Sequence, residues 1–263
     1  MDSRSYEDSR RLGAWLWASL LAAGIAMAFV YQLPAAWFPF LGGPWWLEWL
    51  AFAVFYMTYA TASLPFDIWA GYWLPCRHQR ECPLLPVFLG ALFRSEAIQF
   101  VAMTLSALAM LVAGQRWGAA GALAALAVAQ GLLIALRPHV ARLLGAADAR
   151  PLPARIWMPG FIWNLTGMAW MLLRPWCGAA SVYQLMEAML GGSLWSLAGY
   201  AVLRVRWRDA ALALLYQSWA SFGLFSRATA GLMGRPELWA GAVGAADQPA
   251  EKNSRAASQI SST

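Results

Sequence analysis

Carboxylates are the residues of this chain best placed to do chemistry, because three of them lie in or beside long apolar stretches. Glu187 lies within SVYQLMEAMLGGSLWSLAGY, Asp67 follows one apolar run, and Glu96 opens another. A carboxylate in such surroundings is costly, and it can carry a proton or contact a substrate. For Glu187 such a role stands beside the alternative of a buried pair with Arg174 or Arg227 that fixes helix packing.

Asp67 and Glu96 each allow two interpretations. Asp67 lies at or just beyond the end of an apolar segment, where it can pair with Arg77 or Arg94 or cap the stretch that follows. Glu96 and Gln99 are three residues apart and share a helix face, and Glu96 can also join Asp67 in a polar cluster. Arg94 is expected to reach out of the apolar region to water.

Thiol and imidazole groups gather in LPFDIWAGYWLPCRHQRECP, residues 64–83. Cys76, His78 and Cys82 are potential metal ligands, but zinc sites usually show C-x-x-C pairs and a fourth ligand. The remaining histidine and cysteine, His139 and Cys177, lie far along the chain. We therefore expect no metal site in this stretch.

The same stretch is interpreted as an interfacial turn with aromatic anchors between two helices. Pro65 and Pro75 bracket the turn, and Asp67 falls within it. Three cysteines are too few for a disulfide framework, and a bond between Cys76 and Cys82 is not expected in a reducing cytoplasm.

The composition of the chain is that of a membrane protein. Of its 263 residues, 60% are hydrophobic and 12% are charged, whereas a soluble domain carries about 25% charged residues. Seventeen tryptophans agree with this assignment, since Trp collects at membrane–water interfaces. The only lysine is Lys252, which excludes a retinal Schiff base inside the bundle. The net charge of +6 is spread over loops, so nucleic acid is not expected as a partner.

The chain contains segments of roughly the 20 apolar residues that cross a bilayer. They lack the strict alternation of barrel strands, so we predict an all-α fold, a polytopic transmembrane helical bundle. Seven spans are favoured and six are the alternative, because Arg227 interrupts the last segment. The segments are Leu12–Leu33, Trp45–Leu64, Ala97–Ala113, Trp117–Leu136, Ile156–Leu173, Ser181–Leu203 and Asp209–Leu232.

Arginines alternate between the loops of this prediction. The N-terminus and the loops after the second, fourth and sixth segments are rich in arginine, and the other loops hold one or none. The positive-inside rule therefore places the N-terminus in the cytoplasm and the protein in the inner (plasma) membrane as a multi-pass chain. The arginines on the expected cytoplasmic side are Arg4, Arg10, Arg11, Arg77, Arg80, Arg94, Arg137, Arg142, Arg150, Arg155, Arg204, Arg206 and Arg208.

The expected organisation has three parts. Residues 1–11 form a cytoplasmic N-terminal segment, residues 12–233 the transmembrane domain, and residues 234–263 a polar, disordered tail. Seven spans place the C-terminus outside the cell, whereas a failed seventh crossing leaves it inside.

Small residues line one face of the stretch that contains Glu187. Ala188, Gly192, Ser196 and Gly199 recur at helical spacing, which lets a neighbouring helix approach closely. The neighbour belongs either to this chain or to another subunit.

Motifs of the common enzyme classes are absent from the sequence. The chain has no H-E-x-x-H, no G-x-S-x-G, no P-loop and no Gly-rich dinucleotide fingerprint. We therefore assign no catalytic residue, expect no cofactor and no metal, and do not favour an enzyme.

Residues 60–120 nevertheless resemble a known family. LPFDIWAGYWLPCRHQR, followed by LGALFRSEAIQFVAMTLSALAMLVAGQRWG, resembles the N-terminal membrane region of bacterial M48-class peptidase proteins, relatives of the CAAX prenyl proteases. That family depends on a zinc-binding H-E-x-x-H, which this chain lacks, and Cys76 replaces an expected basic residue. The resemblance implies a peptidase-like membrane module without its catalytic domain. The matching residues are Pro65, Phe66, Asp67, Gly71, Tyr72, Leu74, Pro75, Arg77, Arg80, Arg94 and Gln99.

Two functions follow as expectations. The first is a non-catalytic accessory or scaffold subunit of a membrane assembly, whose partners are the lipid bilayer and other membrane subunits or further copies of itself. The second is a small transporter or intramembrane enzyme that uses Asp67, Glu96 and Glu187. The loop assignment places Asp67 and Glu96 toward the cytoplasm and Glu187 toward the outside, and this separation favours the first function.

Overall fold

The described part of the protein is helical. The computed structural model describes residues 44–78, 84–143, 153–172 and 182–222, together with scattered helical residues between 8 and 30. No strand occurs among these residues, which confirms the all-α prediction. Two helices of this part, Trp45–Arg77 and Leu85–Val140, are long and apolar enough to cross a membrane.

The first long helix runs through the stretch for which the sequence predicts a turn. Helix α3 (Trp45–Ile68) continues into a π-helical turn, η1 (Trp69–Trp73), and then into α4 (Leu74–Arg77). The prediction of an interfacial turn that begins after residue 64 is therefore wrong. A proline perturbs only the turn that precedes it, and the wider π-helical turn lies between the two prolines. Asp67 consequently lies inside a helix.

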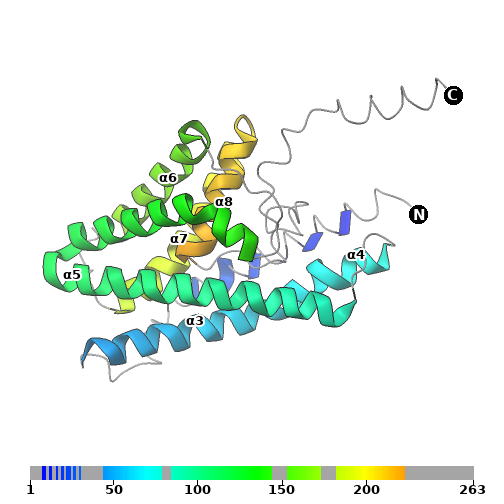
Figure 1. The fold of residues 1–263 in the computed structure, drawn as a ribbon, viewed down its shortest axis with the longest axis horizontal. Helices are drawn as coiled ribbons and strands as arrows, with labels where there is room; N and C mark the ends of the chain where they lie inside the picture. The colour runs from blue at the N-terminus through cyan, green and yellow to red at the C-terminus, as the bar shows by residue number, and fades with distance from the viewer. Residues whose placement is uncertain are drawn as a thin grey trace.

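The second long element, α5 (Leu85–Leu143), is a helical hairpin. Its helical geometry breaks at Trp117 and Gly118, and Gly118 has φ 64° and ψ −156°. A side chain would be strained at this positive φ, so glycine permits the tight reversal. The two arms of α5 run back along each other (Figure 1). The break matches the predicted boundary before Trp117, but the first arm begins at Leu85 rather than at Ala97.

Three further helices pack behind the hairpin. They are α6 (Ala154–Leu172), α7 (Val182–Arg204) and α8 (Arg208–Phe222), and α8 packs against α5, α6 and α7. The turn between α7 and α8 is short, and both helices lie side by side in Figure 1. Arg227 and the predicted C-terminal tail lie outside the described residues.

Helices α6 and α7 are antiparallel and are joined by a reciprocal motif. The sequence WNLTG begins at Trp163 on α6, and WSLAG begins at Trp195 on α7. Each indole nitrogen donates a hydrogen bond of 2.8 Å to the backbone carbonyl of the other tryptophan. Gly167 faces the ring of Trp195, and Gly199 faces the ring of Trp163. The two glycines therefore provide the space in which the two rings stack, with centroids 4.9 Å apart.

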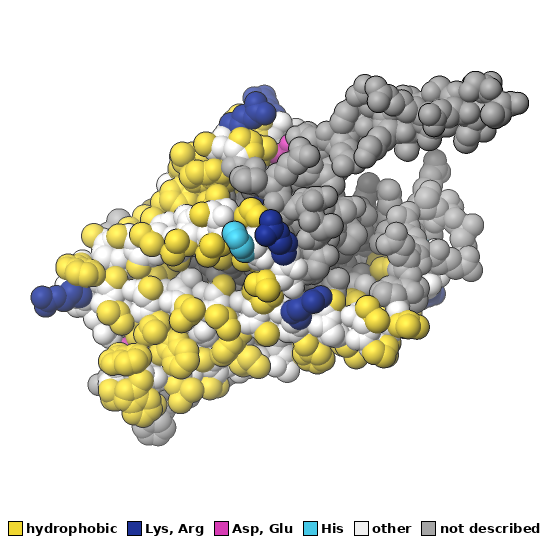
Figure 2. Space-filling view, in the orientation of Figure 1, with side chains coloured by type: hydrophobic (Ala, Val, Ile, Leu, Met, Phe, Trp, Pro, Cys, Tyr) yellow, Lys and Arg dark blue, Asp and Glu magenta, His cyan; other side chains and the backbone are white. Residues whose placement is uncertain are grey.

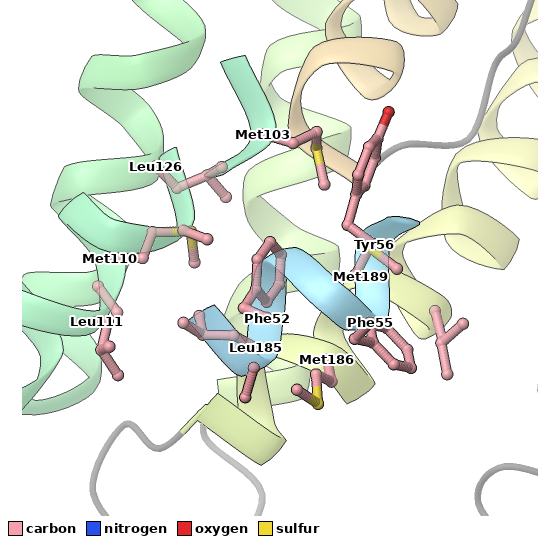
Figure 3. Close-up of a cluster of buried hydrophobic side chains, with 14 of the residues drawn as sticks. Phe52, Phe55, Tyr56, Met103, Met110, Leu111, Leu126, Leu185, Met186 and Met189 are labelled. Atoms are coloured by element: carbon pink, nitrogen blue, oxygen red, sulfur yellow. The ribbon is translucent and has the colours of Figure 1, made fainter. Parts of the chain in front are cut away.

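The apolar core lies where α3, α5 and α7 meet. Figure 3 shows Phe52, Phe55 and Tyr56 of α3 together with methionines and leucines of α5 and α7. Methionine fills irregular gaps well because its side chain is flexible and polarisable. The labelled residues from the other two helices are Met103, Met110, Leu111, Leu126, Leu185, Met186 and Met189.

Large apolar side chains also cover the outside of the bundle. Hydrophobic side chains spread over most of the described face in Figure 2, with arginines at separate points. Helices that are apolar on both the inner and the outer side are typical of membrane spans. The exposed residues include Leu50, Val54, Met57, Val101, Leu105, Val112, Val128, Leu132, Leu136, Ile162, Trp170 and Val202.

Candidate functional site

One face of α3 carries a row of polar side chains. Tyr56, Tyr59, Ser63 and Asp67 are spaced three or four residues apart, which places them on the same side of the helix. Asp67 is fully buried, and the Ser63 hydroxyl donates a hydrogen bond of 3.3 Å to its Oδ2 atom. A carboxylate that the sequence places at a helix end therefore lies within the bundle.

Helix α5 places a second carboxylate opposite this row. Asp67 and Glu96 are close enough for their carboxyl groups to interact electrostatically. Glu96 is partly buried, and in the part of the chain that the structure describes its buried Oε1 atom has no hydrogen-bond partner. Gln99, one turn further along α5, is 1% exposed. Glu96 of α5 thus interacts electrostatically with the polar row of α3 that contains Asp67.

Helix α7 contributes a hydroxyl from a third side. Ser193 is 1% exposed, and its hydroxyl and that of Tyr59 are hydrogen bonded. Ser193 also donates a hydrogen bond of 2.8 Å to the carbonyl of Met189 on its own helix. We call the residues Tyr56, Tyr59, Ser63, Asp67, Glu96 and Ser193 the carboxylate cluster. It joins α3, α5 and α7 through polar groups beside their apolar core.

The other polar residues that the sequence singles out do not belong to the carboxylate cluster. Arg94 is exposed, as expected of an arginine that reaches out of the apolar region. Glu187 is partly buried on α7, six residues before Ser193. Arg174 and Arg227 lie outside the described residues, so the alternative in which one of them pairs with Glu187 stays a prediction.

The predicted small-residue face lies between α7 and its neighbours. Gly199 approaches α6 and α8 so closely that a Cβ atom there would lie 2.5 Å from Trp163 Nε1 and 2.7 Å from Leu214 Cδ2. Ser196 is fully buried, and Gly192 is also buried. Ala188 lies on α7, where the structure describes its backbone. The neighbours that the structure shows at Ser196 and Gly199 belong to the same chain.

Ser196 belongs to a second polar network that sequence reasoning missed. Its hydroxyl donates a hydrogen bond of 3.2 Å to Asn164 Oδ1 on α6, and the Ser218 hydroxyl on α8 donates one of 2.8 Å to Ser196 Oγ. Gln217 beside it donates a hydrogen bond of 2.9 Å to the carbonyl of Trp157. Asn164, Ser196, Gln217 and Ser218 are fully buried and connect α6, α7 and α8.

Two further polar pairs lie at the edges of the bundle. Gln115 Nε2 donates a hydrogen bond of 3.0 Å to Glu48 Oε2, which joins the start of α3 to the end of the first arm of α5. Arg137 is 2% exposed near Tyr216, whose hydroxyl donates a hydrogen bond of 3.0 Å to the carbonyl of Leu133. The first pair was missed because Glu48 and Gln115 are 67 residues apart in sequence.

The cysteines and histidines do not form a metal site within the described part of the chain. No group of three or more His, Cys, Asp or Glu side chains in that part is arranged to hold a metal ion. Cys76 is disulfide-bonded, contrary to our expectation of free thiols in this stretch. Arg77, next to it, lies 4.9 Å from the centre of the Trp73 ring.

The carboxylate cluster can bind a proton or a small cation. Two carboxyl groups close together inside an apolar bundle resist simultaneous ionisation, because each negative charge disfavours the other. Hydroxyl groups of tyrosine and serine can donate to and accept from such a pair. The π-helical turn η1 follows Asp67 closely, and single π-helical turns occur often at functional sites.

Comparison with known protein families, with curated proteins and with solved structures finds no match. The resemblance of residues 60–120 to the membrane region of M48-class peptidase proteins therefore stays a prediction.

Proposed function

We propose that the protein is a multi-pass membrane protein that serves as a non-catalytic accessory or scaffold subunit of a membrane assembly. The observation that carries the membrane part is the exposure of large apolar side chains along both long helices, such as Val54, Val101 and Leu132. A soluble monomer rarely exposes large contiguous apolar surface, whereas lipid tails solvate it at no cost.

The positions of interfacial residues support this placement. On α3 and the π-helical turn after it, Trp46 and Trp69 are 23 residues apart, which corresponds to about 34 Å along a helix. On the first arm of α5, Arg94 and Arg116 are 22 residues apart, or about 33 Å. Both lengths fit a hydrocarbon core of about 30 Å with its interfaces. Asp67 and Glu96 then lie just inside one interface, and Glu48 and Gln115 lie near the other.

Seven spans and a cytoplasmic N-terminus are part of the proposal. The arms of α5 and the helices α6, α7 and α8 correspond to predicted segments three to seven. The alternation of arginines between loops supports the orientation. The inner membrane is the expected location.

A groove on α3 favours the subunit interpretation. It has a volume of about 670 Å³ and is lined by small and apolar side chains, among them Met57, Thr58, Thr61 and Ala62. Small residues let a second transmembrane helix approach closely. The proposed partner is therefore a transmembrane helix of another subunit, seated along this face of α3.

Purification of the full chain in mild detergent tests the subunit proposal. We expect one partner in stoichiometric amount by mass spectrometry, lost in Ala62→Trp, which fills the groove. Leu132→Trp, on an exposed part of the second arm of α5, is the matched control and should keep the partner. A partner that is retained in Ala62→Trp, or a protein that purifies alone, contradicts the proposal.

The carboxylate cluster favours a second candidate function, a small transporter or an intramembrane enzyme. A transporter or an intramembrane enzyme needs carboxylates that converge on one site, whereas a scaffold subunit does not. Asp67 and Glu96 interact electrostatically, which favours the first of these classes. Proton or cation flux in vesicles that contain the purified chain tests this candidate. Flux lost in Asp67→Asn and in Glu96→Gln, but kept in Glu48→Gln, supports it. Equal flux in all four proteins rejects it.

A further inference from the structure

The Oε1 atom of Glu96 presents a specific chemical problem. It is buried and has no hydrogen-bond partner among the described residues, and its carboxyl group interacts electrostatically with that of Asp67. A buried acceptor without a donor is costly, and more costly when it carries charge. The side chain is therefore stabilised by any ligand that removes this charge.

Among the described residues, the groups that interact with Glu96 do not supply a positive charge. Tyr56 and Tyr59 on α3 are the titratable side chains that interact with it besides Asp67. Arg94 precedes Glu96 by two residues, so it points to another side of α5, and it is exposed. Ser193 of α7 contacts Tyr59 and is neutral.

We propose that Glu96 binds an exchangeable proton at neutral pH while Asp67 remains ionised, so that the carboxylate cluster is a proton-binding site. Asp67 is the better anion of the two because its Oδ2 atom lies 3.3 Å from the Ser63 hydroxyl, which it shares with the Ala60 carbonyl, whereas Glu96 Oε1 has no such donor among the described residues. The proton comes from water at the adjacent interface: hydronium transfers it to a Glu96 oxygen and leaves water behind. The inference deepens the second candidate function and rests on the proposed membrane placement.

Carbodiimide labelling tests the proposal on the full chain. Dicyclohexylcarbodiimide is apolar and reacts with protonated carboxyl groups, and mass spectrometry of peptides locates the stable N-acylurea. In the wild-type protein in detergent at neutral pH, we expect the adduct on Glu96 and none on Asp209, which is exposed on α8. This measurement needs no variant that could fail to fold.

The variant Asp67→Asn tests whether the negative charge of Asp67, in addition to burial, keeps the proton on Glu96. Removing the neighbouring negative charge makes ionisation of Glu96 easier, so the pH midpoint of its labelling should fall by about one unit or more. Glu48→Gln, at the far end of α3, is the matched control and should leave the midpoint unchanged. Glu96→Gln should abolish the adduct.

Two results would overturn the inference. One is a Glu96 that remains unlabelled at neutral pH while it labels in acid, as an ordinary exposed carboxyl would. The other is a midpoint that does not move in folded Asp67→Asn. Neither result bears on the subunit proposal, which depends on co-purification, so the two can fail separately.

Discussion

Trp163 and Trp195 donate hydrogen bonds to each other's backbone carbonyls, each at 2.8 Å, across the interface between α6 and α7. Each ring lies against a glycine that follows the other tryptophan by four residues, Gly199 for Trp163 and Gly167 for Trp195. The arrangement satisfies both indole donors at the contact between two apolar helices, although the pair is partly exposed at the outer side of the bundle. It also explains why these two helices can be so close.

Gly199→Ala should lower the thermal stability of the protein in detergent. A Cβ atom at position 199 would lie 2.5 Å from Trp163 Nε1, so the ring must move and its hydrogen bond to Trp195 must weaken. We expect a loss of about 1–3 kcal/mol, as for overpacked cores. Tryptophan fluorescence during heating measures it. Gly131→Ala is the control, because a Cβ atom at position 131 would meet nothing within 4 Å, and an equal loss there would contradict the explanation.

Ser218→Ala should also destabilise the bundle, by about 0.6 to 1.7 kcal/mol, the range for interhelical hydrogen bonds in membranes. Ser218 donates to Ser196, which donates to Asn164, so the three residues act as one network. The double variant Ser196→Ala with Ser218→Ala should therefore cost less than the sum of the single changes. Strict additivity in thermal unfolding would show that the bonds are independent. Thr166→Val serves as the control, because the Thr166 hydroxyl is exposed and its hydrogen bond lies within its own helix.

The helices were predictable because their apolar segments are long, whereas their ends were not. The first arm of α5 begins at Leu85, ahead of the prediction, since Pro86 fits the first turn of a helix. Pro65 and Pro75 indicated a turn, but each proline in a helix removes only one donor, and the tertiary structure keeps the helix intact. That error placed Asp67 at or just beyond the end of the helix rather than within it.

The candidate site was predictable only in part. Asp67 and Glu96 were identified as rare acids, and their proximity was one of two alternatives. Tyr59, Ser63 and Asp67 are spaced four residues apart, which indicates one polar face of a helix. The predicted helix ends at residue 64, before Asp67, so the prediction did not include this face. Ser193 could not be found, because its contact with Tyr59 depends on how α7 packs.

Gln115→Leu should destabilise the contact between α3 and the first arm of α5. It leaves the carboxylate of Glu48, which is 9% exposed, without the 3.0 Å hydrogen bond from Gln115. A hydrogen bond to a charged group contributes about 1.5–3 kcal/mol when its partner is removed, and partial exposure of the pair favours the lower end. Thermal unfolding measures the loss. In the Glu48→Gln background, Gln115→Leu should cost less, and an unchanged cost would show that the bond is unimportant.

The two ends of the second arm of α5 should face opposite sides of the membrane. Arg116 and Arg142 lie on either side of this arm, and both are exposed. The arginine distribution assigns the loop at Arg116 to the outside and the loop at Arg142 to the cytoplasm. A membrane-impermeant maleimide should therefore label Arg116→Cys in intact cells, and Arg142→Cys only after permeabilisation, each above the level of the wild-type cysteines.

Labelling of both from the same side would contradict a crossing by this arm, and labelling in the reverse order would invert the whole orientation. The second result would also place Cys76, which is disulfide-bonded, outside the cytoplasm, where such bonds persist.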